Sequence, residues 1–210
     1  SGAESAELTL TGADGAPLLT DRGRDVSEKN TVFRRVVETP ARGVSVGALS
    51  PGEEARLTVF GRSFSLAPLK KYKAAECGGT RSPCAEKLPG GAMRIGVAEG
   101  QGHDLFGFSA AVPSGYITLA MRLRIPEEEL ALLPDEKRLF LFCPRFPADE
   151  QEGTAVTAGD FRAAPADREG YRVLSDSFLN RTEGLMEGRI TNFRAATMEV
   201  LDFTFYSGRP

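Results

Sequence analysis

The sequence predicts a mostly antiparallel, all-β protein built as a sandwich or jelly-roll, with one short helix near residues 126–133. Three observations predict this class. Apolar and polar residues alternate along several short runs, which is the period of a strand with one buried face. The 23 glycines and 13 prolines mostly fall between these runs. A single glutamate-rich segment has the signature of a helix.

The first third of the chain holds several strand candidates. A weak one covers residues 8–10, and two more cover 31–39 and 44–49, each closed by a proline within two residues. In 57–66, apolar and polar residues alternate on both sides of Gly61. This pattern predicts a hairpin with a tight turn.

The clearest signal is the run 115–125, where every second residue is apolar. We predict that these residues are buried and that the alternate positions face solvent or a binding surface. Arg122 and Arg124 occupy that second face, so they are candidate ligand-binding residues. The alternating apolar residues are Ile117, Leu119, Met121, Leu123 and Ile125.

Pro126 ends this strand, and Glu127, Glu128 and Glu129 follow it. Acidic side chains are stabilising at the positive end of a helix dipole. Leu130 comes one turn later, so the segment predicts a helix of about two turns.

Residues 139–143 are apolar at consecutive positions, which predicts a strand buried between two layers, with Cys143 as an inert thiol. The run 200–206 is another long strand, and 188–193 is expected to pair with it. Glu199 and Asp202 are three positions apart, so along a regular strand they would face opposite sides.

We expect a single domain over 1–210, with long loops at 67–91 and 148–170, the second containing a short strand near 154–157. Residues 1–66 are too polar and too few to bury a robust core alone. The alternative is two β domains, 1–66 and 92–210. Long loops on a rigid scaffold commonly carry binding residues.

Cys77 and Cys84 flank a turn-rich insert, Gly-Gly-Thr-Arg-Ser-Pro, which predicts a local disulfide. A disulfide indicates an oxidising address: secreted, periplasmic or on the cell surface. Free thiols in a cytosolic protein are the alternative.

Charge and hydropathy exclude two classes of partner. The net charge is -3, and acidic and basic residues are interleaved, so no basic face for nucleic acid is expected. No apolar run approaches the roughly 18 residues of a membrane-spanning segment.

Motifs of catalysis are weak. Gly43-Val44-Ser45-Val46-Gly47 has the G-x-S-x-G spacing, but a strand pattern follows it where the nucleophile elbow needs a helix. The single histidine, His103, rules out a multi-histidine zinc site, so we expect no metal and no cofactor.

His103 and Asp104 remain ligand-binding candidates, because the carboxylate can orient the imidazole or share a cation. Tyr116 is a third, since no tryptophan is present and a stacked sugar ring would need Tyr72, Tyr116, Tyr171, Tyr206 or a phenylalanine.

These observations favour a non-enzymatic extracytoplasmic binding or adhesion protein that uses loops or one face of a β-sandwich to hold a protein or carbohydrate at a surface. The alternative is a polysaccharide-acting hydrolase or lyase with carboxylates on a concave β face. A second alternative is a structural subunit of a surface assembly.

Overall fold

The computed structural model describes residues 6–11, 16–23, 43–47, 57–60, 66–80, 85–96, 104–146, 154–180, 183–193 and 195–208. The chain divides into two compact units, 1–56 with Pro210, and 57–209. The single-domain expectation and its two-domain alternative stay predictions.

The described part of the first unit is a three-stranded antiparallel sheet in the order β2-β1-β3. The strands expected at 8–10 and 44–49 fall within or overlap β1 and β3, whereas 31–39 lies outside the described residues. The strands are β1 (Ala6–Thr11), β2 (Pro17–Gly23) and β3 (Gly43–Gly47).

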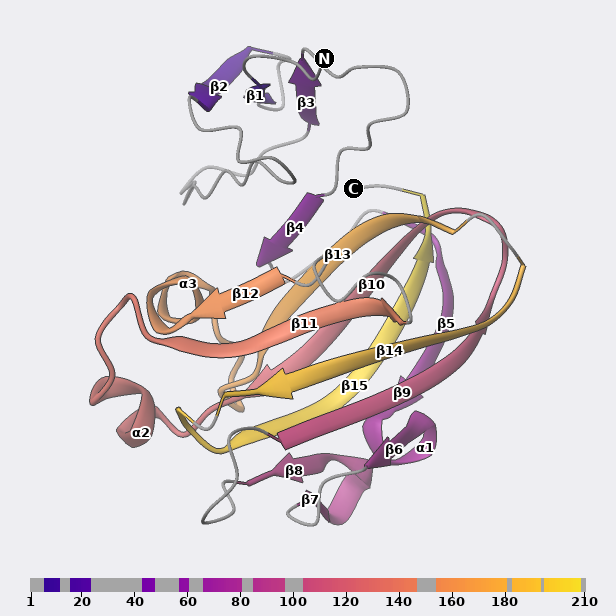
Figure 1. Cartoon of the computed structure of the whole chain (residues 1–210), viewed down its shortest axis with the longest axis vertical. Helices are drawn as coiled ribbons and strands as arrows, with labels where there is room; N and C mark the ends of the chain where they lie inside the picture. The colour runs from indigo at the N-terminus through magenta and orange to yellow at the C-terminus, as the bar shows by residue number, and fades with distance from the viewer. Residues whose placement is uncertain are drawn as a thin grey trace. The chain divides into compact units, whose positions relative to one another are not determined.

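The second unit is a sandwich of two antiparallel sheets, which confirms the predicted fold class (Figure 1). The larger sheet follows the order β4 (Leu57–Phe60), β13 (Arg172–Asn180), β10 (Gly115–Arg124), β15 (Met198–Ser207), β8 (Met93–Ile95) and β7 (Ala85–Lys87), with β5 (Pro68–Lys73) paired to β15 off this path. The smaller sheet runs β12 (Thr154–Thr157), β11 (Arg138–Phe146), β14 (Gly184–Asn192), β9 (Asp104–Val112) and β6 (Gly78–Thr80).

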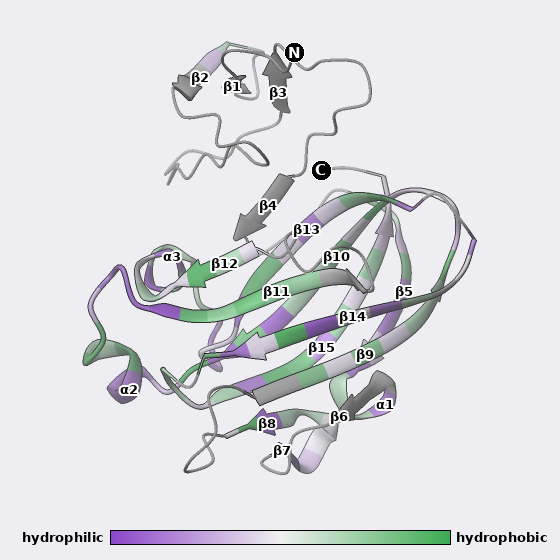
Figure 2. Cartoon of the chain, viewed as in Figure 1, coloured by the Kyte–Doolittle hydropathy of each residue, from purple (hydrophilic) through white to green (hydrophobic). Residues whose placement is uncertain are grey.

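The two sheets are joined by a core of large side chains from their facing sides. Phe203 of β15 stacks on Phe106 and Phe108 of β9, with ring centroids 5.9 Å and 4.5 Å apart. Hydrophobic and hydrophilic stretches alternate along the strands (Figure 2), as expected when each strand contributes one face to a core. The core therefore lies between the sheets.

Strand β10 behaves as its alternation predicts on the inner face, where Leu119, Met121 and Leu123 are all fully buried. The outer face is only partly exposed. Thr118 is buried and shares a 2.7 Å hydrogen bond with Ser177, so the expectation that the whole outer face meets solvent is wrong at this end of the strand. On this face Tyr116, Arg122 and Arg124 stay exposed or half-exposed, whereas Thr118 and Ala120 are buried.

The predicted pairing of 188–193 with the C-terminal strand is wrong. Strand β14 pairs with β11 and β9, whereas β15 pairs with β10, β5 and β8 in the other sheet. The chain crosses from one sheet to the other between β14 and β15. These two strands, consecutive in sequence, thus belong to different sheets.

The predicted helix is present as α2 (Glu127–Ala131), with Leu130 buried. Two helices were not predicted, α1 (Ala74–Cys77) and α3 (Ala158–Ala163), together with a 3-10 turn, η1 (Pro89–Gly91). Each is too short to show a helical period. The start of α3 is a capping box between Thr157 and Asp160, and its Arg162 donates to the carbonyl of Leu130 at 2.7 Å.

The loop expected at 67–91 is not a loop throughout, since it contains β5, α1, β6, β7 and η1. These short strands extend both sheets, and their lysines and glycines concealed the pattern. The short strand expected near 154–157 is confirmed as β12. Strand β4 pairs with β13, and the second arm of the expected 57–66 hairpin lies mostly outside the described residues.

Cys143 is a free, buried thiol, as predicted. Cys84 lies outside the described residues, so the Cys77–Cys84 disulfide stays a prediction. In the described part of the chain, no helix has the length and apolar character to cross a membrane.

Candidate functional site

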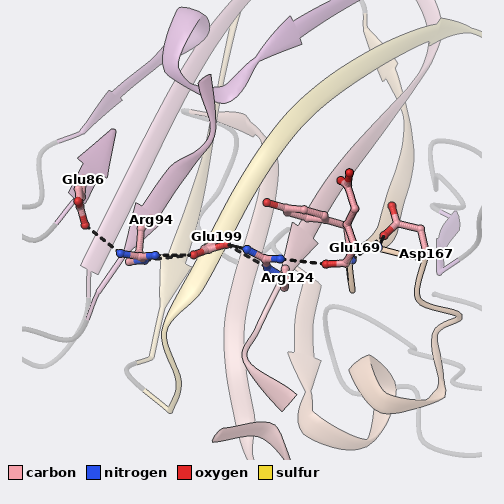
Figure 3. Close-up of polar contacts among 7 residues, drawn as sticks. Glu86, Arg94, Arg124, Asp167, Glu169 and Glu199 are labelled. Carbon is pink, nitrogen blue, oxygen red and sulfur yellow. Dashed lines mark hydrogen bonds and ion pairs between the residues drawn. The ribbon is translucent and has the colours of Figure 1, made fainter. Parts of the chain in front are cut away.

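A row of alternating charges crosses four neighbouring strands of the larger sheet (Figure 3). The strand register places Glu86 of β7 opposite Arg94 of β8, Arg94 opposite Glu199 of β15, and Glu199 opposite Arg124 of β10. Residues directly opposite on adjacent strands point to the same face, so the four side chains form one continuous row. We call it the first charged row.

Hydrogen bonds connect every step of this row. Arg94 donates from Nη1 to Glu86 at 3.1 Å, and from Nε and Nη2 to Oε1 of Glu199 at 3.2 and 2.9 Å. Arg124 donates from Nε to Oε2 of Glu199 at 3.0 Å and also from Nη2. Glu199 therefore accepts four hydrogen bonds, which is the capacity of a carboxylate.

A second charged row lies beside the first and consists of Lys73, Asp202 and Arg122. Asp202 of β15 is opposite Lys73 of β5 on one side and Arg122 of β10 on the other. The lysine that contacts the Asp202 carboxylate is not Lys73 but Lys71, also on β5, whose Nζ is 2.9 Å away. On the other side, Nη1 of Arg122 is 3.6 Å away.

Glu199 and Asp202 face the same side of the sheet, contrary to expectation. The register between β10 and β15 shifts at Leu201, because Arg122 is opposite Asp202 while Leu123 is opposite Val200. Such a shift adds one residue to β15 and restores the same side chain direction after three positions. It brings both carboxylates under the arginines of β10.

The turn 167–171 closes one side of the site. The Asp167 carboxylate accepts hydrogen bonds from the backbone N–H groups of Glu169 and Tyr171, both at 2.9 Å, and from Nη2 of Arg122 at 2.5 Å. Arg124 donates to the carbonyl of Glu169 at 2.9 Å. Both arginines are thus tied to this turn.

Tyr171 lies against the two arginines. Its ring centroid is 4.7 Å from Cζ of Arg124 and 5.6 Å from Cζ of Arg122, distances typical of cation–π contacts. The tyrosine is 7% exposed. It supports the guanidinium groups rather than presenting a ring to solvent.

The opposite side is formed by the turn 88–92, closed by a 2.8 Å hydrogen bond from the N–H of Leu88 to the carbonyl of Ala92. Gly91 has a φ of +87°, and a Cβ placed on it would lie 3.1 Å from Cβ of Lys73. Glycine therefore lets this turn approach the second charged row closely.

An open pocket of about 570 Å³ lies over the rows and between the two turns. Its surface is mostly polar. The lining residues are Lys73, Leu88, Pro89, Gly90, Ala92, Arg94, Arg122, Arg124, Glu169, Tyr171, Glu199 and Leu201.

The carboxylates at the bottom of the pocket are buried and the cations above them are not. The Glu199 and Asp202 side chains are 8% and 1% exposed, whereas the three arginine side chains are 31–41% exposed. Burial alone would raise the pKa of Glu199, but hydrogen bonds from Arg124 and Arg94 outweigh it and hold the pKa below its ordinary 4.5.

The pKa of Asp167 is set by the same two opposing effects. Burial favours its neutral form, but bonds from Arg122 and from the backbone of Tyr171 and Glu169 hold its pKa below the ordinary 3.8. Both carboxylates are therefore ionised at neutral pH. Among the described residues, no group of three or more histidine, cysteine, aspartate or glutamate side chains is arranged to hold a metal ion.

The structure brings Arg122 and Arg124 together in this pocket. Tyr116 is 42% exposed but belongs to the other end of β10, and it does not line the pocket. His103 and the side chain of Asp104 lie outside the described residues, and Asp104 begins β9 of the smaller sheet. Their roles as ligand-binding residues stay predictions.

The sequence did not indicate the partners of Arg122 and Arg124. Their pairing with Glu199, Asp202 and Asp167 depends on strand register and on one turn, which single-sequence patterns do not specify. The one available signal was the charge at alternate positions of β10, Arg122 and Arg124.

No family model matches the chain, and no curated protein matches it in sequence. Solved structures resemble its fold distantly. The structure of CsCBM6-3 from Clostridium stercorarium in complex with cellobiose has 14% identity and a TM-score of 0.39, covering 66% of this chain and 94% of that one.

The carbohydrate-binding module CBM6cm-2 from Cellvibrio mixtus lichenase 5A, in complex with cellotriose, has 11% identity and a TM-score of 0.40, covering 68% of this chain and 100% of that one. The catalytic unit of the GH87 α-1,3-glucanase from Streptomyces thermodiastaticus has 13% identity and a TM-score of 0.34, covering 67% and 27%. At these values the likenesses carry no argument about ligand or activity. What this chain binds must be inferred from its own residues.

Proposed function

We propose that the chain is a non-enzymatic, extracytoplasmic carbohydrate-binding protein whose ligand occupies the pocket over the two charged rows. The observation that carries the proposal is an open pocket of about 570 Å³ with a floor fixed by cross-strand ion pairs. Small-ligand sites commonly have volumes of about 300–1,000 Å³. A floor already held in place loses little conformational entropy when a ligand binds.

The polar lining favours a carbohydrate over a protein partner. Stable protein–protein sites centre on a desolvated apolar or aromatic anchor. Here the floor is charged, and Tyr171, the one aromatic residue among the described lining residues, is buried beneath arginines. A hydroxyl-rich ligand matches such a surface better.

The hydrolase alternative is disfavoured by the state of the carboxylates. A glycosidase needs a general acid with a raised pKa beside a second carboxylate. The pKa values of Glu199 and Asp167 are both lowered by their arginine partners. Neither group can hold a proton at neutral pH to protonate a leaving group.

The extracytoplasmic address rests on the predicted Cys77–Cys84 bridge. The mass of the chain purified without reductant should be lower by two hydrogens than that of the reduced chain. Two free thiols at these positions would count against an extracytoplasmic location but not against carbohydrate binding.

The binding function is tested by blocking the pocket without changing its charge. Leu201 lines the pocket at the register shift. We expect the full chain to bind at least one glycan on a microarray of plant, algal and bacterial polysaccharides, and Leu201→Trp to lose that binding because indole fills the pocket.

Leu132→Trp is the matched control, since Leu132 is 84% exposed and does not line the pocket. It should bind as the unaltered chain does. Retained binding in Leu201→Trp would place the site elsewhere. Release of products from any bound glycan, abolished by Glu199→Gln, would establish the enzyme alternative instead.

A further inference from the structure

We infer that the ligand is an acidic oligosaccharide, and that a uronate carboxylate binds to the solvent-facing N–H groups of Arg94, Arg122 and Arg124. The inference rests on the proposed function and names the ligand class of the same pocket. Four features of the pocket support it.

The first feature is that Glu199, the carboxylate that lines the floor, cannot accept a hydrogen bond from a ligand. Both oxygens of Glu199 already take two hydrogen bonds each from Arg94 and Arg124. Neutral sugars usually bind through hydroxyl groups that both donate and accept. This floor offers them few acceptors.

The second feature is a surplus of donors. A guanidinium has five N–H groups. Among the described residues, Arg94 and Arg124 each make three hydrogen bonds, which leaves two N–H groups on each. Arginine N–H groups bind carboxylates more strongly than neutral acceptors.

The third feature is the distribution of charge. Of the residues that the structure describes, four basic and two acidic ones line the pocket. The wider cluster is nearly balanced, because Glu86, Asp167 and Asp202 also pair with the arginines. Glu199 and Asp202 are 8% and 1% exposed and offset the arginines above them, whereas Glu86 and Asp167, at 63% and 33%, are as accessible to a ligand as the arginines are. The net charge of the wider cluster is therefore small, and the excess of basic side chains in the pocket lining is what favours an anionic group.

The fourth feature is the missing aromatic platform. Neutral pyranose rings commonly stack on exposed aromatic rings. The chain has no tryptophan, and Tyr171, the aromatic residue of the pocket, is 7% exposed under the arginines. Recognition by charge does not need such a platform.

The charge of the ligand is tested by calorimetric titration of the full chain with trigalacturonate and trimannuronate, each compared with its fully methyl-esterified form. The ester keeps the sugar and removes the charge. We expect each acid that binds to bind about tenfold or more tightly than its ester, and the difference to shrink with added salt. Equal affinity for acid and ester would overturn the inference.

Three variants test the residues. Arg124→Gln should weaken uronate binding about tenfold or more. Arg124→Lys keeps the charge but cannot donate two parallel hydrogen bonds, so its affinity should lie between those of Arg124→Gln and the unaltered chain. Arg138→Gln, an exposed arginine at the start of β11 and outside the pocket, is the control and should change nothing. Thermal melts of each variant show whether it is folded at the titration temperature.

Glu169→Gln gives a prediction of opposite sign. Glu169 lines the pocket, and its carboxylate points away from the first charged row (Figure 3). Removing this charge should strengthen uronate binding and leave the ester unaffected. Weaker uronate binding in this variant would contradict the inference.

The remaining outcomes separate the inference from the function it rests on. A neutral glycan that binds and is lost in Leu201→Trp would overturn the acidic ligand but leave the binding function. A hexaglutamate peptide that binds more tightly than either uronate would replace the sugar by an acidic protein segment. Absence of binding to every glycan would overturn both proposals.

Discussion

Glu199 joins the two arginines that shape the pocket, and its place could not be predicted from the sequence. Three residues separate it from Asp202, and a regular strand turns such residues to opposite faces. The shift at Leu201 places both on the outer face. A shift of this kind depends on the neighbouring strand, so it leaves no local signal in a single sequence.

Replacing Glu199 by glutamine should lower the free energy of unfolding by about 1–3 kcal/mol at pH 7, because one acceptor oxygen becomes an NH2 group facing an arginine and the remaining hydrogen bonds lose their charge. The pKa of the carboxyl is lowered in the folded state. Its contribution is therefore fully present above the ordinary pKa of 4.5 and decreases as the pH falls below it. Urea unfolding at pH 7 and pH 3 should show a large difference from the unaltered chain at pH 7 and a smaller one at pH 3.

Glu86→Gln is the control for this experiment. The Glu86 side chain is 63% exposed, although it pairs with the same arginine. Exposed ion pairs contribute little, so we expect a change of about 0.5 kcal/mol or less at either pH. A difference between Glu199→Gln and the unaltered chain that does not depend on pH would contradict the assignment of the lowered pKa.

Thr118 is the residue at which the expected solvent-exposed face is wrong. Its hydroxyl donates to the carbonyl of Gly208 at 2.7 Å and shares a hydrogen bond with Ser177. Thr118→Val keeps the shape and removes both bonds, so we expect a loss of about 1–3 kcal/mol in urea unfolding. Thr204→Val, on the same face of β15, is the matched control, with an expected change of about 0.5 kcal/mol or less. Equal effects of the two variants would show that burial of Thr118 has no energetic consequence.

At the scale of single elements, the sequence predicted strands well where one face is apolar and poorly where strands are short. The alternation in β10 is visible because Leu119, Met121 and Leu123 all enter the core. Strands β6, β7 and β8 have three residues each and show no period. The pairing partners of β14 and β15 follow from the crossing between sheets, which hydrophobic periodicity does not encode.

Strand β10 provides a test of its two faces. Leu123→Asp should unfold the second unit, because Leu123 is fully buried and an aspartate there would be unpaired in the core. The free energy needed to bury that charge is large compared with a free energy of unfolding of about 5–15 kcal/mol. Arg122→Ala removes a half-exposed side chain bonded to Asp167, so it should lower stability by about 1–2 kcal/mol and leave a cooperative melt. Thermal melts of the two variants, recorded side by side, should differ widely. Similar losses would contradict the inward and outward assignment.

The turn 88–92 provides a matched pair of glycines. Gly90 and Gly91 have φ values of +81° and +87°, so alanine at either should cost about 1–2 kcal/mol for the left-handed backbone. A Cβ on Gly90 meets nothing within 4 Å, whereas one on Gly91 would lie 3.1 Å from Lys73. Gly91→Ala should therefore be the more destabilising in urea unfolding and should also weaken ligand binding. Gly90→Ala with the larger effect would show that the close approach to Lys73 is unimportant.

At the scale of the whole molecule, the sequence predicted the class and the two layers, because long amphipathic strands and a strand buried on both faces require a second sheet. It did not predict that the first unit ends near residue 56 and that β4 and β5 belong to the sandwich. Both strands attach to the larger sheet through backbone hydrogen bonds, and β5 contributes mostly exposed, lysine-rich positions. Such residues carry no core signal.

The sandwich of the second unit should fold without the first unit. Among the residues whose burial the structure describes, the buried apolar ones lie between Ala74 and Phe205, and the described lining of the pocket lies within 57–209. Residues 57–209 produced alone should therefore melt cooperatively, at a temperature close to that of the sandwich in the full chain, and bind the same ligand. Residues 92–210, the second domain of the alternative predicted from sequence, would lack β4, β5 and β7, which pair with β13, β15 and β8. This shorter chain should not melt cooperatively. If 57–209 also fails to fold while the full chain shows one transition, the chain is a single domain over 1–210.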